Sequence, residues 1–211
     1  MEIAIIGGGC SALLLLMHLL PQLKHTAHSV TIFSDEPYLG RGVAYSTSND
    51  AHLLNGPAGN MSALHDDSDH FLAYCRKRDS SLSSSSFVPR RFYGEYLTAC
   101  WEQLARNYPV QLKHISARVV AVNCVLAGYA LHASNGDVYR ADYVVLALGH
   151  FSKAGSGQHM IGSAEGHGQQ IGNSWSVQDV QACDGVREVL LIGSGHTAVD
   201  VVLSLQQLKQ P

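Results

Sequence analysis

Short apolar segments alternate with longer segments of helical character along the first part of the chain. Residues 2–6 are a short apolar run, residues 11–23 carry leucine on every face, and residues 29–33 are β-branched and aromatic. The first and third runs are typical of strands, and the second is typical of a buried helix. A glycine triplet separates the first run from the second. This order predicts a right-handed strand–helix–strand unit with two parallel strands.

The middle of the chain predicts two helices separated by loops. Residues 35–64 are rich in Gly, Pro, Asn and Ser and have little periodicity, which indicates a long ordered loop. Residues 66–78 predict a helix with Ser68 or Asp69 as its N-cap, and the serine-rich residues 80–86 predict a surface loop. Residues 89–108 predict a second helix, with a proline near its start and another just beyond its end.

Most of the remaining segments predict strands. Residues 118–125 and 129–134 form a predicted hairpin, and Asn135-Gly136 supplies a tight turn into residues 138–139. Residues 143–148 and 188–192 are continuous apolar runs, each predicted to be a buried parallel strand. Residues 197–208 predict a further helix. We therefore expect an α/β fold with a parallel sheet, a helical insertion over about residues 60–110 and a small antiparallel β-meander.

Composition excludes several classes of function. The 211-residue chain has 46% hydrophobic residues and a net charge of -3, so no basic surface for nucleic acid or for an anionic membrane is expected. Its five scattered cysteines form no CxxC pair, and its histidines form no HExxH motif, so no metal site is expected. Scattered thiols are typical of a cytoplasmic protein. No apolar run is long enough to span a bilayer.

The first glycine loop follows the first predicted strand and opens the first predicted helix. Its GxGxxA pattern consists of Gly7, Gly8, Gly9, Cys10, Ser11 and Ala12. In this pattern the first glycine allows the tight turn, the second lets a pyrophosphate approach the backbone, and the small last residue lets helix and strand pack closely. The free N–H groups at the start of the helix then bind the phosphates. The loop therefore predicts a dinucleotide site, with a glycine turn that binds no ligand as the alternative.

The second predicted strand lacks the acid that usually follows it. A dinucleotide site commonly places Asp or Glu there for the ribose hydroxyls. Ser34 is the residue directly after the strand, and Asp35 and Glu36 come next. Asp35 serves if the strand ends one residue late, and Ser34 offers a weaker hydrogen bond. The alternative is that Asp35 and Glu36 only form a solvated turn.

A second glycine loop occurs near the end of the chain. It comprises residues 193–198, with Gly193, Gly195 and Ala198 at the pattern positions and Asp200 shortly after. Two such loops suggest one site for FAD and one for NAD(P)H. The chain after Ala198 is too short for the remaining strands of a dinucleotide-binding half. We therefore expect a truncated second domain, or a segment with another role.

The sequence resembles the FAD/NAD(P)-binding oxidoreductases with two dinucleotide-binding domains, which include flavin-containing and N-hydroxylating monooxygenases. The resemblance is carried by both glycine loops, by LGRGVAYST at residues 39–47, by HLLN at 52–55 and by MSAL at 61–64. It continues through FVPRR at 87–91, residues 93–94 and 141–149, and NSW at 173–175. It implies a Rossmann-like FAD-binding domain. Relatives in this family are about twice as long, and they return to complete the FAD domain after an NAD(P) domain.

The resemblance also implies roles for individual residues. Gly7, Gly9, Ser11 and Ala12 would hold the FAD pyrophosphate, and Ser34 stands where the family usually has a glutamate for the ribose. The remaining contacts would come from Arg41 and Gly42 along the cofactor, Asn55 to Met61 near the isoalloxazine, Val119 at the adenine, and Ala147 and Gly149 at a strand end over FAD. Gly193, Gly195 and Ala198 would hold the nicotinamide dinucleotide.

Together these features predict residues 1–150 as an FAD-binding domain, 151–186 as a linker and 187–211 as the start of an incomplete NAD(P)-binding domain. The predicted function is an FAD-dependent, NAD(P)H-using oxidoreductase acting on a small molecule, with monooxygenation preferred. The alternative is a cofactor-binding protein without catalysis. The substrate, the catalytic residues and the choice between NADH and NADPH are not indicated. Apolar Val201, Val202 and Leu205 on the last helix predict a homodimer or poor solubility.

Several single residues carry two interpretations each. Cys10 is either a reactive thiol at a helix N-terminus or a small residue tolerated there. Arg90 and Arg91 either clamp a phosphate or begin a solvated helix. His150 and His196 are either acid–base groups or loop histidines without a catalytic role.

Overall fold

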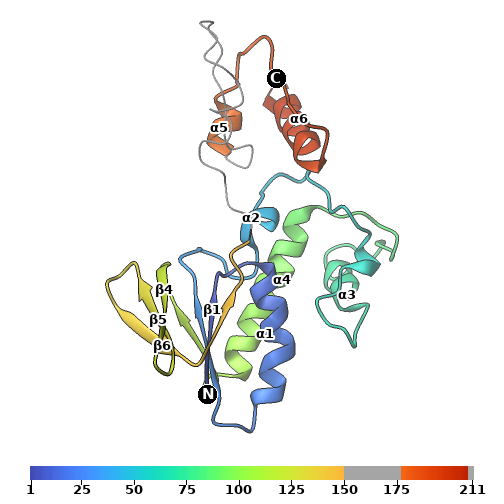
Figure 1. Ribbon diagram of the computed structural model, residues 1–211. Coiled ribbons are helices and arrows are strands. Elements are labelled where there is room, and N and C mark those ends of the chain that lie inside the picture. The colour runs from blue at the N-terminus through green and yellow to red at the C-terminus, as the bar shows by residue number, and fades with distance from the viewer. Residues whose placement is uncertain (150–176, 209–211) are drawn as a thin grey trace, which may run out of the picture.

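The first strand–helix–strand unit forms at the predicted residues. The computed structural model describes residues 1–149 and 177–208, and it begins with β1 (Glu2–Ile6), α1 (Cys10–Leu23) and β2 (Ser29–Phe33) (Figure 1). β1 and β2 pair in parallel, from Glu2 opposite Ser29 to Ile6 opposite Phe33. The prediction of a parallel βαβ unit is therefore confirmed.

Two further strands complete a four-stranded parallel sheet in the order β3-β2-β1-β7. β3 (Leu112–Ile115) lies beside β2, and its four residues were not predicted to be a strand. β7 (Tyr143–Leu146) lies beside β1 and ends two residues earlier than predicted.

The prediction that β7 is a buried strand is wrong. Tyr143 is 59% exposed and Leu146 is 64% exposed. In the described part of the chain β7 has a partner strand on one side only, so it forms an edge of the sheet. Its apolar composition therefore reflects a surface that the described residues do not cover.

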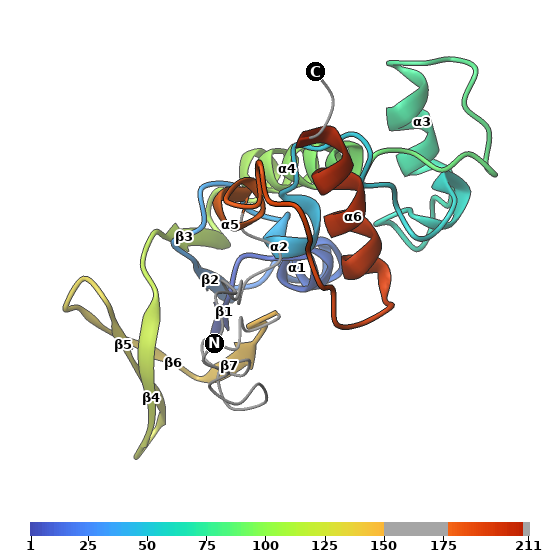
Figure 2. The ribbon, with the colours of Figure 1, turned by 90° about the horizontal axis from the view of Figure 1, so that it is seen from above.

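The parallel sheet separates two apolar cores because side chains alternate between its faces. Ile3, Ile5, Val30 and Ile32 face α1 and the other helices of the large core. Ala4, Ile6 and Phe33 face the opposite way and pack against Leu131 of the meander. The result is three layers, with helices on one face of the sheet and the meander on the other (Figure 2).

The meander consists of β4 (Val119–Val125), β5 (Gly128–Ala133) and β6 (Val138–Ala141), paired antiparallel in that order. The turn at Asn135-Gly136 has a glycine with φ of +89°, the conformation for which this dipeptide is favoured. Both the predicted hairpin and the turn are confirmed. The expected α/β fold with a parallel sheet and an antiparallel meander is confirmed as well.

The helical insertion predicted at about residues 60–110 contains α3 (His70–Arg76) and α4 (Arg90–Asn107). Two short helices, α2 (Gly42–Tyr45) and a 3-10 helix at Ala58–Asn60, lie in the segment that was predicted to be a loop. Asp69 is the N-cap residue of α3, but its side chain makes no capping hydrogen bond. α4 packs beside α1 along the sheet (Figures 1 and 2). Gly94 on α4 allows a close approach to α2, since a Cβ there would lie 2.1 Å from the carbonyl oxygen of Tyr45.

The C-terminal part contains α5 (Val177–Gln181), a helix that was not predicted, and α6 (His196–Leu208), which was. The predicted strand at 188–192 is wrong: these residues are irregular, and Leu190 is 86% exposed. Within the described ranges no strand lies beside them to accept their backbone hydrogen bonds. Among the residues described, no helix is both long and apolar enough to cross a membrane.

Candidate functional site

The first glycine loop, residues 7–12, lies at the carboxyl end of β1 and is held by the ends of its two neighbouring strands. Gly7 has φ of +111°, and a Cβ at this position would lie 2.2 Å from the carbonyl oxygen of Ala147, just beyond β7. A Cβ on Gly8 would lie 2.4 Å from Oγ of Ser34, just beyond β2. Both positions therefore require glycine for the turn itself.

Gly9 differs because the fold alone does not require its lack of a side chain. A Cβ at Gly9 would lie 3.6 Å from Cα of Gly42, which is an ordinary contact. Gly9 is the N-cap residue of α1, and no side chain caps this helix. Bare backbone from Gly9 and Gly42 thus borders an uncapped helix N-terminus, which is the surface that a pyrophosphate requires. The first loop fits a dinucleotide.

Ser34, Asp35 and Glu36 follow β2, and the structure shows different contacts for each of them. Ser34 is buried, and its Oγ accepts a hydrogen bond of 3.2 Å from the backbone N–H of Glu36. Asp35 forms an exposed ion pair of 3.2 Å with Arg118, which directly precedes β4. Partial burial of its carboxyl raises the pKa of Glu36, the charge of Asp35 raises it further, and a backbone hydrogen bond from Gly42 lowers it. Asp35 and Glu36 therefore supply two carboxyl groups directly after β2, while Ser34 stabilises the turn that contains them.

The other residues predicted to contact FAD lie in several different elements. Nε of Arg41 donates to Oγ1 of Thr98 at 2.9 Å, and its guanidinium lies 4.3 Å from the ring centre of Tyr38. Val119 begins β4 and packs against the meander core, and Gly149 has φ of +67°. A Cβ on Gly56 would lie 3.5 Å from Sδ of Met61.

Cys10, in the first glycine loop, packs against the large core. Burial raises the pKa of its thiol, and a hydrogen bond with Tyr93 only partly offsets this. A raised pKa disfavours the reactive thiolate. The structure therefore supports the interpretation of Cys10 as a tolerated small residue. Burial also raises the pKa of Tyr93 well above its usual range.

The second glycine loop, residues 193–198, has the turn geometry that its pattern requires. Gly193 has φ of +124°, and Ala198 N–H donates to the carbonyl oxygen of Gly195 at 2.9 Å as α6 begins. A Cβ on Gly195 meets nothing within 4 Å. The loop is exposed in the described part of the chain, unlike the first one. Of the two predicted loop histidines, His196 is the first residue of α6, and His150 lies outside the described residues.

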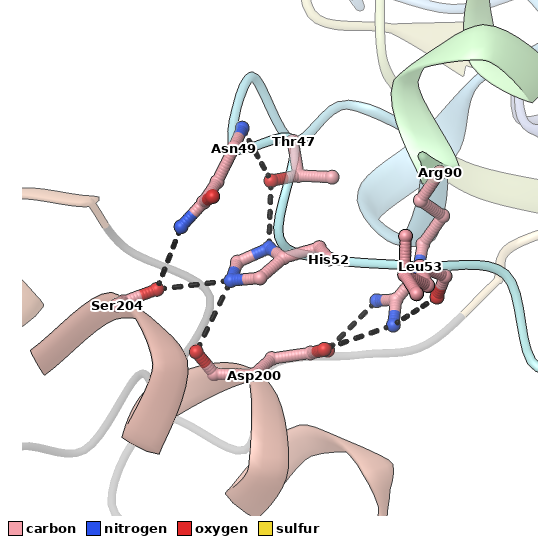
Figure 3. Close-up of polar contacts among 7 residues, drawn as sticks. All are labelled: Thr47, Asn49, His52, Leu53, Arg90, Asp200 and Ser204. Carbon is pink, nitrogen blue, oxygen red and sulfur yellow. Dashed lines mark hydrogen bonds and ion pairs between the residues drawn. The ribbon is translucent and has the colours of Figure 1, made fainter. Parts of the chain in front are cut away.

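Arg90 has a role that the sequence did not indicate. Its guanidinium makes two hydrogen bonds to the carboxylate of Asp200, at 2.8 and 3.0 Å, and both side chains are about nine-tenths buried (Figure 3). Arg90 also donates to the carbonyl oxygen of Leu53 at 3.2 and 3.3 Å. Both sequence interpretations, a phosphate clamp and a solvated helix start, are therefore wrong for Arg90. Arg91 instead forms an exposed ion pair with Asp50.

A set of hydrogen bonds extends this contact between α6 and the loop before α4 (Figure 3). The ring nitrogen Nε2 of His52 lies 2.9 Å from Oγ of Ser204 and 3.1 Å from the carbonyl oxygen of Asp200. Its other ring nitrogen lies 2.8 Å from Oγ1 of Thr47. Asn49 donates to Oγ of Ser204 at 3.3 Å. Asp200 follows the second glycine pattern in the sequence, but no sequence pattern relates it to this loop.

Two cavities border α6. The larger, about 720 Å³, lies between residues 36–52 on one side and α5 and α6 on the other. The smaller, about 160 Å³, is lined by Tyr45 and Asn55, by Arg90 and Asp200, and by His196 of the second glycine loop. The smaller cavity therefore joins the second loop to Asn55, which the sequence predicted near the flavin. In the described ranges no group of three His, Cys, Asp or Glu residues is placed to hold a metal ion.

Solved structures to which this chain is similar include two monooxygenases. A cyclohexanone monooxygenase from Rhodococcus sp. Phi1, solved with NADP+, is 18% identical with a TM-score of 0.53, covering 72% of this chain and 26% of that one. A flavin-containing monooxygenase from Stenotrophomonas maltophilia is 20% identical with a TM-score of 0.48, covering 69% of this chain and 37% of that one. The chain thus spans only about a quarter to two fifths of the length of these proteins.

Sequence comparison identifies the family of the chain. No curated protein sequence matches it significantly. Residues 4–151, which include the first glycine loop, the meander and all but the first two residues of the parallel sheet, match the family described as FAD-NAD(P)-binding. The match covers well over half of the chain. This protein therefore belongs to the FAD-NAD(P)-binding family.

Proposed function

We propose that the protein is an FAD-dependent, NAD(P)H-using oxidoreductase, or the FAD-binding part of one. The observation that carries the proposal is the first glycine loop: an uncapped helix N-terminus bordered by Gly9 and Gly42, in a chain of the FAD-NAD(P)-binding family. In this proposal residues 1–150 bind FAD, and residues 187–211 begin the unit that binds NAD(P)H. Residues 151–186, of which the structure describes only the last part, connect the two.

Each site residue has a proposed task that follows from its position. Backbone N–H groups of residues 9–12 bind the pyrophosphate at the start of α1. Asp35 or Glu36 takes the ribose hydroxyls, because Ser34 is buried in the turn that its hydroxyl stabilises. The segment between Asn55 and Met61 approaches the isoalloxazine, and Val119 and Gly149 border the adenine side and the strand end, respectively.

The chemistry belongs to the cofactors. When bound, FAD accepts a hydride from NAD(P)H and passes electrons to oxygen or to an organic substrate. The residues of the chain need only bind, orient and exclude water, and we assign none of them a catalytic role. The fold is shared with a cyclohexanone monooxygenase, and we therefore propose monooxygenation of a small molecule as the reaction. The five free cysteines support a reducing, cytoplasmic location.

One pair of glycine substitutions tests the assignment of the two loops. Gly9→Ala is tolerated by the fold, because its Cβ meets only Cα of Gly42 at 3.6 Å. The methyl group would nevertheless keep the pyrophosphate from the backbone, so we expect at least about a tenfold loss of bound FAD. Gly195→Ala is the matched variant: it should retain FAD but slow the bleaching of the flavin by NAD(P)H. The measurements are visible absorbance, mass identification of the released cofactor, and stopped-flow bleaching.

Each outcome decides a different part of the proposal. A wild-type protein that is colourless and takes up no added FAD would contradict the first site. A yellow protein that releases FAD but is not bleached by NADH or NADPH would instead support the alternative, a binding protein without catalysis. Equal loss of FAD in both glycine variants would show that the effect is not specific to the first loop.

A further inference from the structure

We propose that Arg90, Asp200, His52 and Ser204, here called the α6 contact, are positioning residues that hold the second glycine loop at the flavin site. The inference rests on the proposed function, because it concerns how the two cofactor sites meet. None of the four residues belongs to either glycine pattern. They would act by fixing α6, which carries the second loop at its N-terminus, on the segment that leads toward the isoalloxazine.

The ion pair fixes α6 from one side. Arg90 and Asp200 are each 8% exposed, and the two hydrogen bonds of 2.8 and 3.0 Å are bidentate. The same guanidinium binds the carbonyl oxygen of Leu53, so one side chain joins α4, the loop at residue 53, and α6. Bidentate pairs of this kind are restrictive in geometry as well as attractive.

His52 fixes α6 one turn further along. Its Nε2 contacts both the carbonyl oxygen of Asp200 and the hydroxyl of Ser204, two groups that are successive along one face of the helix. A rotation of α6 by one residue, about 100°, would break this contact and the ion pair together. The contact therefore defines a single register of the helix on the loop.

Stability alone does not explain such a contact. A buried ion pair is often no better for stability than apolar side chains of similar size, whereas removal of one partner is costly. What the pair adds is a defined geometry. The small cavity of about 160 Å³ is lined by His196 of the second loop and Asn55 of the predicted flavin segment, together with Arg90 and Asp200. The geometry that the pair defines is therefore the position of the second loop next to this segment.

If this arrangement links the two sites, FAD binding and the docking of α6 affect each other. Bound FAD would order residues 52–61, and through His52 and Arg90 it would also hold α6. By linkage, any ligand that favours the docked α6 would in turn favour bound FAD. FAD should therefore slow amide hydrogen exchange along α6, although that helix lies outside the first glycine loop.

The test compares the whole chain with two variants, by hydrogen exchange with and without FAD and by flavin bleaching with NAD(P)H. Asp200→Leu leaves Arg90 buried without its partner, and we expect exchange along α6 to rise on the order of 100-fold. The FAD content should stay at the wild-type level while the maximal bleaching rate falls at least about tenfold. In Arg90→Met/Asp200→Leu both charges are gone, and protection of α6 should return because apolar side chains can replace the pair.

Arg91→Met is the matched control, since it removes a neighbouring arginine whose ion pair with Asp50 is exposed. It should change neither α6 exchange nor bleaching. The proposal would be overturned if amide exchange along α6 in Asp200→Leu were as slow as in the wild type. It would also be overturned if exchange were faster but the bleaching rate unchanged, because the contact would then be structural only. If wild-type flavin is not bleached at all, the proposed function fails, and the effect of FAD on α6 exchange still decides whether the α6 contact couples the sites.

Discussion

Tyr96 joins the loop that follows the predicted flavin segment to the helical core through its hydroxyl group. The ring is 1% exposed, and its oxygen accepts a hydrogen bond of 3.1 Å from the backbone N–H of Ala63 and lies 2.7 Å from Nδ1 of His70. Burial raises the pKa of this phenol well above its usual range, so the group is neutral at neutral pH. The hydroxyl is thus the partner of a buried backbone amide.

Tyr96→Phe should lower the free energy of unfolding by about 1–3 kcal/mol, because the amide of buried Ala63 loses its partner. Urea denaturation followed by circular dichroism measures this. Tyr139→Phe is the control, since its hydroxyl binds Asp137 in an exposed position; its effect should stay within about 0.5 kcal/mol. Equal effects of the two substitutions would contradict the role given to the Tyr96 hydroxyl.

At this scale the sequence predicted residues whose role is local. The turn at Gly7 involves residues close in sequence that belong to a known pattern, so the spacing of the glycines was sufficient to predict it. Arg90 and Asp200 were not paired, because they are 110 positions apart and neither pattern nor periodicity relates them. Ser34 was weighed as a ribose ligand, since nothing in the sequence shows that its hydroxyl binds the Glu36 amide.

Packing between helices depends on one glycine. α2 lies against α4 at Gly94, where a Cβ would be 2.1 Å from the carbonyl oxygen of Tyr45. Within a helix alanine is more favourable than glycine by about 1 kcal/mol. The tertiary contact therefore works against the local preference of α4, and the two effects predict opposite results for the same substitution.

Gly94→Ala should reduce stability by about 1–3 kcal/mol despite its better helix propensity, because backbone atoms of α2 must move away. Thermal and urea unfolding give the sign directly. Gln103→Ala, an exposed position on the same helix, should change stability by less than about 0.5 kcal/mol. A stabilised Gly94→Ala variant would mean that α2 does not pack as the structure shows.

Among the elements, the sequence predicted helices with clear local signals and missed a strand that depends on its partner. α1 was predicted from a leucine-rich run after a glycine loop, and α4 was predicted from the prolines at its two ends. β3 was missed because its four residues include Lys113 and His114, and it is a strand only through its pairing with β2. The apolar run at 188–192 was wrongly predicted to be a strand, since a run alone cannot show whether a neighbouring strand is available.

Several apolar side chains are exposed in the described C-terminal part of the chain and at the edge of the sheet. Leu190 is 86% exposed, Ile192 is 78% exposed and Val202 is 40% exposed. Leu146 at the edge of the sheet is 64% exposed. Exposed apolar side chains of this size favour association between copies.

We expect the 211-residue chain to form dimers or larger species at micromolar concentration, as measured by light scattering. Leu190→Ser/Ile192→Ser should increase the monomer fraction, because both side chains are exposed and neither supports the fold. Leu126→Ser, at a fully exposed and isolated turn position, should leave it unchanged. A monodisperse wild-type monomer would contradict this expectation.

The α6 contact differs in kind from the interfaces that build the rest of the molecule. The sheet is held to its helices by apolar side chains, whereas α6 is joined to α4 by the ion pair and to the loop by hydrogen bonds of His52 and Asn49. If α6 moves away as a unit, both charges and all of these polar groups are hydrated again. Separation therefore exposes mainly polar groups rather than apolar surface. The free-energy cost of removing one partner of the ion pair is therefore much larger than the cost of separating the two partners. A junction of this kind is exact when closed and yet reversible, which suits a place where one cofactor must stay and the other must come and go.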